Sequence, residues 1–88
     1  MRPNRLLARI HLSPHNVRFG DFERLAFALG FRRVDGEGSH RTYAHTVHPR
    51  ARLNLQPVGG EAKPYQVKQL LKLVEEYNLR LEGEDDDP

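Results

Sequence analysis

The chain contains no cysteine, and this absence excludes two ways in which a small protein can be stabilised. Without thiols it has neither a disulfide bond nor a metal site built from thiolates. Long apolar runs are also missing, so we expect no segment that spans a membrane. The chain does not open with a signal-peptide pattern either. These absences favour a cytoplasmic protein.

The 88 residues suffice for one small domain with a limited core. Its charge is unevenly distributed, because residues 1–81 hold all fourteen Lys and Arg but only seven Asp and Glu, a net charge of +7. The other five acids fall in residues 82–88, which contain no apolar residue and are predicted to form a disordered acidic tail. We therefore expect a single domain over residues 1–81. Its positive charge favours an anionic partner, although an ordinary solvated surface explains it equally well.

The spacing of apolar residues predicts three helices, over residues 4–12, 20–30 and 63–78. The middle helix has Asp21 in its first turn, where a carboxylate complements the helix dipole. Gly30 ends that helix, since glycine tolerates a left-handed conformation. The predicted core residues of the three helices are Leu6, Leu7 and Ile10; Phe22, Leu25, Ala26 and Leu29; and Val67, Leu70, Leu71 and Val74. The phenylalanines Phe19, Phe22, Phe27 and Phe31 are also assigned to the core.

Three strands are predicted between the last two helices, over residues 31–35, 40–47 and 50–56. The core face of the second strand stays open, because Tyr43 and Val47 point one way and Ala44 points the other. Short connections between strands indicate an antiparallel meander. The expected fold is α+β: a three-stranded antiparallel sheet with the helices packed on one face.

A histidine follows a Gly-Ser turn at Gly38-Ser39-His40, at the start of the second predicted strand. Histidine can take and give a proton near neutral pH. Metal-free cleavage of RNA needs a base for the ribose 2′-hydroxyl and an acid for the leaving 5′ oxygen, and DNA lacks that hydroxyl. Alone, a histidine in this position is more simply explained as a turn residue that hydrogen-bonds the backbone.

Other side chains near this turn suit a nucleic-acid ligand. Lys63, just before the last helix, could bind a phosphate together with the N–H groups of the helix terminus. Tyr43 and Tyr65 could stack on bases, although Tyr43 could equally pack within the sheet. The predicted sheet also carries arginines that could either contact phosphates or protect strand edges. They are Arg32, Arg33, Arg41, Arg50 and Arg52.

A metal site is the other chemistry to consider for the histidines. His45 and His48 could join His40, but residues three apart in a strand face opposite sides of the sheet. No carboxylate is obviously placed beside them. We therefore expect no metal.

Four segments carry a resemblance to a known family. They are Leu29-Gly30-Phe31, Gly38-Ser39-His40, Leu53-Asn54-Leu55-Gln56-Pro57 and Lys63-Pro64-Tyr65-Gln66-Val67-Lys68-Gln69-Leu70. In this order, over roughly residues 17–79, they resemble the HicA toxins of bacterial and archaeal type II toxin–antitoxin pairs. The chain departs from that family at Arg41, where members often carry a second histidine. The helix over 4–12 and the acidic tail also extend beyond the minimal toxin.

The resemblance implies an mRNA interferase, a metal-independent endoribonuclease, with a fold like a double-stranded-RNA-binding domain. It implies that His40 is catalytic, that no cofactor is used, and that a HicB-like antitoxin covers the site. For RNA binding we expect Ser39 to shape the turn, and Arg41 and Lys63 to contact phosphates. Two alternatives remain: a non-catalytic RNA-binding module of similar fold, and a protein-interaction domain. The sequence names no second catalytic group.

Overall fold

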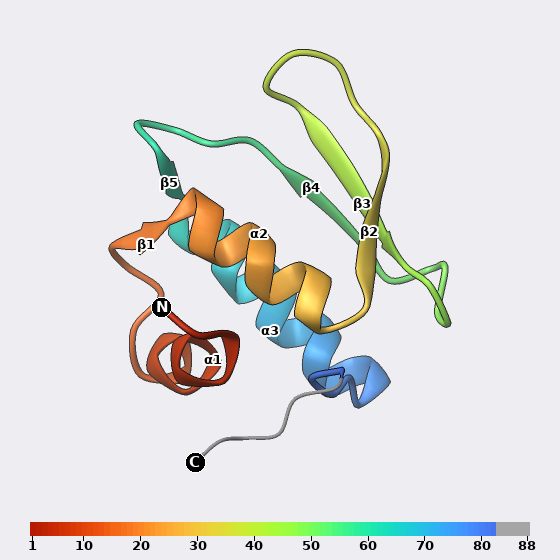
Figure 1. Cartoon of the computed structure of the whole chain (residues 1–88), viewed down its shortest axis with the longest axis horizontal. Helices are drawn as coiled ribbons and strands as arrows, with labels where there is room; N and C mark the ends of the chain where they lie inside the picture. The colour runs from red at the N-terminus through yellow and green to blue at the C-terminus, as the bar shows by residue number, and fades with distance from the viewer. Residues whose placement is uncertain (83–88) are drawn as a thin grey trace.

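The computed structural model describes residues 1–82 (Figure 1). All the predicted helices and strands are present, and their ends lie within two residues of the predicted ones. The elements are α1 (Pro3–Leu12), β1 (Val17–Arg18), α2 (Phe19–Ala28), β2 (Phe31–Asp35), β3 (Arg41–His45), β4 (Arg52–Leu55), β5 (Glu61–Ala62) and α3 (Pro64–Tyr77).

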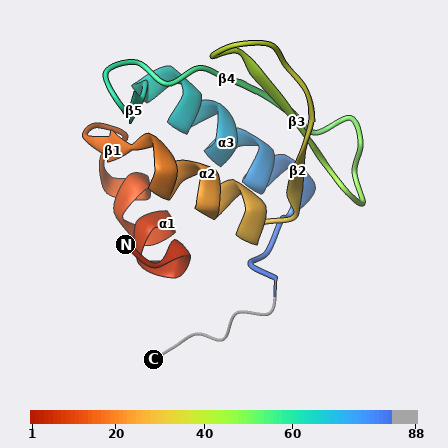
Figure 2. The same cartoon turned by 45° about the horizontal axis from the view of Figure 1, so that its top comes forward.

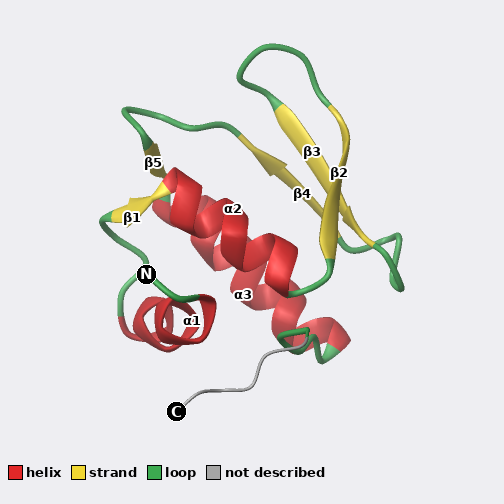
Figure 3. Ribbon diagram, viewed as in Figure 1, coloured by secondary structure: helices red, strands yellow, loops and turns green. Residues whose placement is uncertain are grey.

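The main sheet has the strand order β2-β3-β4, and both pairs are antiparallel. The α+β class and the three-stranded antiparallel sheet are therefore confirmed. Helix α2 contacts β2 and helix α3 contacts β4, so the two helices lie against the sheet in one layer (Figures 1 and 2). Helix α1 packs on α2. Figure 3 shows the strands of this sheet on one side of the helices.

The register of the sheet settles which face of β3 belongs to the core. Tyr43 pairs with Arg33 on one side and with Leu53 on the other. Tyr43 and Leu53 are fully buried toward the helices, whereas Val47 lies beyond the strand and is 70% exposed. The bulky aromatic ring thus decides the inward face, because it buries the larger apolar area.

A second, two-stranded pairing was not predicted. Val17 pairs with Ala62 and Arg18 with Glu61, so β1 and β5 join the start of α2 to the segment before α3. A backbone hydrogen bond of 2.9 Å from Phe19 N to the Gly60 carbonyl extends this contact. Strands of two residues are too short to show a period of two, which is why the sequence does not reveal them.

The core joins all three helices to the sheet. Most predicted core residues are buried, but Phe27 is 38% exposed, so its assignment to the core is wrong. Phe27 lies off the apolar stripe of α2. Its ring centre is 6.0 Å from the centre of the buried Tyr43 ring. The buried apolar residues that pack together include Leu6, Ile10, Phe22, Leu25, Leu29, Phe31, Leu53, Leu55, Val67 and Leu70.

The C-terminal end of the described chain packs back on α2. Gly30 ends that helix with φ of +103°, as the sequence predicts. Glu82, assigned to the acidic tail, donates its backbone N–H to the Ala28 carbonyl at 2.6 Å, and its carboxylate lies 3.8 Å from Arg32. Glu82 therefore belongs with the folded body, and the rest of the predicted tail, 83–88, lies outside the described residues.

Candidate functional site

The Gly38-Ser39-His40 turn lies in the loop between β2 and β3, which projects beyond the helices (Figure 1). His40 is exposed and directly precedes β3. Its N–H donates to the Glu37 carbonyl at 3.0 Å. Gly36 has φ of +135°, and a Cβ at this position would clash with the His40 carbonyl. The loop is thus a tight turn that holds the backbone of His40 while its side chain stays open to ligands.

A chain of amide contacts ties this loop to the rest of the domain. Gln56, just after β4, donates its amide to the Ser39 hydroxyl oxygen at 3.4 Å. Gln66, in the first turn of α3 and 1% exposed, donates to the Gln56 carbonyl at 3.3 Å. The side-chain oxygen of Gln66 accepts the N–H of Lys63 at 3.2 Å, which caps the helix start. Hydrogen bonds therefore link the His40 loop to the end of β4, and the end of β4 to the start of α3.

A pocket of about 310 Å³ lies where these three segments meet. Its lining, drawn from the described residues, includes no carboxylate. The polar character and the absence of acidic groups suit a ligand that carries phosphate and polar rings. The lining residues are His40, Arg41, Thr42, Asn54, Leu55, Gln56, Tyr65 and Gln66.

His40 also borders a second hollow, which is lined by Asp35, Gly36 and Glu37. The histidine thus has carboxylates on one side and the acid-free pocket on the other. The sequence patterns do not single out Asp35 and Glu37 as site residues. Their positions on either side of the Gly36 turn were the available signal, since the turn brings both back toward His40.

Arg41 already has a partner within the domain. Its Nη1 lies 3.3 Å from a carboxylate oxygen of Glu23 on α2, and its guanidinium lies 5.1 Å from the centre of the Phe19 ring. Tyr43 donates its hydroxyl to the same Glu23 oxygen. Contact with Tyr43 and the charge of Glu23 raise the pKa of Arg41 above its usual range. A phosphate would therefore compete with Glu23 for this arginine.

The structure separates the remaining candidates. Tyr43 is fully buried, which excludes base stacking on its ring and leaves sheet packing as its role. Burial, and then the hydrogen bond to Glu23, raise its pKa to about 12. Tyr65 is 63% exposed and lines the pocket. Lys63 is exposed at the start of α3 and is not part of the pocket lining.

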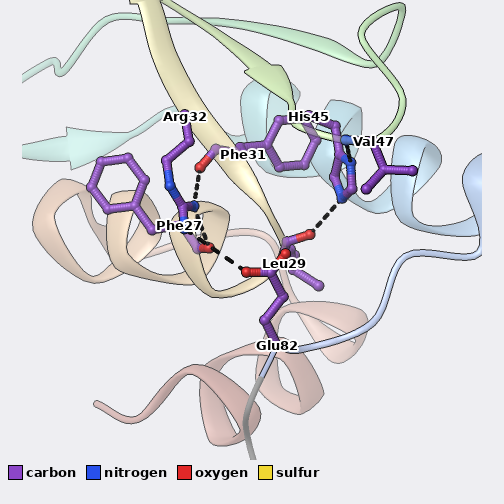
Figure 4. Close-up of polar contacts among 7 residues, drawn as sticks. All are labelled: Phe27, Leu29, Phe31, Arg32, His45, Val47 and Glu82. Atoms are coloured by element: carbon purple, nitrogen blue, oxygen red, sulfur yellow. Dashed lines mark hydrogen bonds and ion pairs between the residues drawn. The ribbon is translucent and has the colours of Figure 1, made fainter.

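His45 has a structural role that the sequence does not reveal (Figure 4). Its Nε2 lies 2.8 Å from the Leu29 carbonyl at the end of α2. Its Nδ1 accepts the backbone N–H groups of Val47 and His48, at 3.1 and 3.3 Å. This pattern requires a neutral ring with its proton on Nε2. Both ring nitrogens are occupied, so His45 is not available to a metal.

Residues 1–82 contain no group of three or more His, Cys, Asp or Glu side chains placed to hold a metal ion. The same residues contain no helix that is long and apolar enough to cross a membrane.

Comparisons of the chain with protein-family models, with curated proteins and with solved structures gave no match. The resemblance to HicA toxins therefore rests on the quoted sequence segments.

Proposed function

We propose that the protein is a metal-independent endoribonuclease of the HicA type and that His40 transfers a proton during cleavage. The observation that supports this most directly is the position of His40. Its side chain is exposed at the edge of a polar pocket without carboxylates, on a loop that the Ser39–Gln56 contact ties to β4. The net charge of +7 over residues 1–81 favours a polyanionic substrate.

The reaction begins when the ribose 2′-oxygen attacks the adjacent phosphorus while a base takes the hydroxyl proton. The bond from phosphorus to the 5′ oxygen then breaks, and an acid protonates that oxygen. The products are a 2′,3′-cyclic phosphate and a 5′-hydroxyl end. His40 performs one of these transfers, and Asp35 and Glu37 in the adjoining hollow are the candidates for the other. Each positioned transfer typically contributes about 10²–10⁴-fold to the rate.

The order of the elements supports a fold like a double-stranded-RNA-binding domain, because along the chain α2 precedes and α3 follows the three-stranded antiparallel meander β2-β3-β4. The site acts on mRNA in the cytoplasm. A HicB-like antitoxin is the expected protein partner, and by covering the pocket it would block access to His40.

The test is cleavage of a defined RNA by the purified protein with a chelator present. His40→Ala should lose at least about 100-fold in rate while retaining RNA binding. The matched control is His15→Ala, which removes another exposed histidine, far along the chain from the pocket. Replacing the nucleotide at the cut by its 2′-deoxy analogue should also stop cleavage, since the nucleophile is then absent. Equal cleavage by wild type and His40→Ala, or products with only 5′-phosphate ends, would refute this mechanism.

A non-catalytic RNA-binding module is the second candidate, and the composition of the pocket favours it. His40 is the one histidine among its lining residues, and no carboxylate accompanies it in that pocket. This candidate predicts salt-sensitive RNA binding without strand scission by any variant. A protein-interaction domain predicts no RNA affinity at physiological salt.

A further inference from the structure

The wall of the pocket that α3 contributes carries an exposed aromatic ring. Tyr65 is the second residue of α3 and is 63% exposed. Within residues 1–82 its ring stacks on no other ring, and its hydroxyl has no hydrogen-bond partner. The face of the ring is therefore available to a flat ligand in the pocket.

Two amide side chains, Asn54 of β4 and Gln56 just after β4, border the same pocket, and each has one of its two polar groups already hydrogen-bonded. Asn54 accepts the Thr42 hydroxyl at 3.0 Å through its oxygen, so its amide nitrogen remains a donor. Gln56 uses its nitrogen on Ser39, so its oxygen remains an acceptor. The pocket thus offers one donor and one acceptor beside an open aromatic face.

We propose that this pocket is a nucleobase subsite for single-stranded RNA. Tyr65 stacks on one base, and Asn54 and Gln56 hydrogen-bond to its polar edge. Every base carries neighbouring donors and acceptors on its edge, and in RNA these are accessible mainly where the strand is unpaired. The volume of about 310 Å³ lies at the lower end of the range of roughly 300–1,000 Å³ for small-molecule sites, which suits one base.

This inference rests on the proposed function and adds a specificity to it. His40 lies at the edge of the subsite, so the phosphodiester it acts on adjoins the nucleotide whose base is held. Cleavage should therefore depend on the identity of one base at a constant distance from the cut. Gln56 has a double role, because it also fixes Ser39 and hence the His40 loop.

The first experiment measures binding of fluorescein-labelled single-stranded octamers made of 2′-O-methyl RNA, which cannot be cleaved. Each base in turn is replaced by an abasic residue. For the wild-type protein, one position should lower affinity by roughly tenfold to a hundredfold, the usual effect of losing one stacked base. Tyr65→Leu should lower affinity for the intact octamer by a similar factor. Tyr65→Phe is the matched control and should bind like wild type.

The decisive result is the combination of the two changes. If the ring stacks on that base, Tyr65→Leu should bind the abasic octamer and the intact octamer with equal affinity, because the variant has already lost the contact with that base. The subsite is refuted if the abasic residue lowers the affinity of Tyr65→Leu as much as that of wild type. It is also refuted if an abasic residue lowers the affinity at no position.

The second experiment sequences the ends produced from a random RNA pool. Asn54→Asp replaces the free donor by an acceptor, so the preferred base at one position relative to the cyclic-phosphate ends should change. An unchanged base preference would overturn the role of Asn54. Because Asn54 is an exposed strand residue, the fold should survive the change, as thermal melting will verify.

The outcomes separate this subsite from the proposed reaction. RNA that binds with the predicted abasic pattern but is never cut would refute the nuclease and support the subsite. RNA that is cut through His40 without any base dependence would refute the subsite and support the nuclease. No binding of any octamer at low salt would refute both.

Discussion

His45→Ala should destabilise the protein severely. The sequence does not reveal this, because it places His45 in the same predicted strand as His40. The side chain is 7% exposed and bonds three backbone groups, of which the Leu29 carbonyl is buried. A buried acceptor without its partner costs about 1–3 kcal/mol, and each of the two part-buried N–H groups adds about 0.5–1 kcal/mol. Loss of the edge contact with Phe31, at 5.3 Å, adds to this. We expect His45→Ala to lower the free energy of unfolding by about 3–4 kcal/mol in total, which is a large part of the stability of a small domain.

The assay is urea denaturation followed by circular dichroism, with His40→Ala as the control. His40 is exposed, so its replacement should change the free energy of unfolding by less than about 0.5 kcal/mol. Amide exchange at Val47 and His48 should also accelerate in His45→Ala, because both N–H groups lose their acceptor. If His45→Ala is as stable as His40→Ala, the three backbone bonds of His45 do not contribute to the stability of the domain.

The other predictions concern α2 and its neighbours. Gly30→Ala should destabilise the protein by about 1–3 kcal/mol, because φ is +103° and the new Cβ would lie 2.5 Å from His45 Nε2. Gly20→Ala should instead stabilise it by up to about 1 kcal/mol, because Gly20 lies in a helix and its new Cβ would meet open space. Thermal melts of the two variants test this pair, and equal shifts would contradict it. The pKa of Tyr43 is raised to about 12, so its contribution to stability is complete below about pH 10 and is lost as pH rises toward 12. Wild type should therefore lose more stability than Tyr43→Phe between about pH 9 and 11, and parallel urea midpoints across that range would contradict it.

Much of the fold could be predicted from local patterns. The apolar stripes and the signal at Gly30 placed the helices within two residues, since a helix end depends mainly on residues in its own turns. Where a pattern was weak, the prediction failed or stayed open. Phe27 was assigned to the core on its residue type alone, and the inward face of β3 became clear only from its pairing with β2 and β4.

The site shows the same division. The sequence determined that His40 follows a tight glycine turn, because that conformation depends on Gly36 and Gly38 themselves. It also determined the basic character of residues 1–81. It could not tell that Arg41 is held by Glu23, eighteen residues earlier, since no local spacing relates an arginine on a strand to an acid on a preceding helix.

Only the tertiary structure decided which histidine is structural and which is open to a ligand. His45 and His40 are both strand-associated in sequence, but packing of α2 against the sheet brings the Leu29 carbonyl to His45 and leaves His40 exposed. Likewise, Asn54 and Tyr65 reach one pocket because the end of β4 and the start of α3 are tied together through Gln66. Local periodicity governs the elements, whereas contacts between residues far apart in the chain arise only when those elements pack.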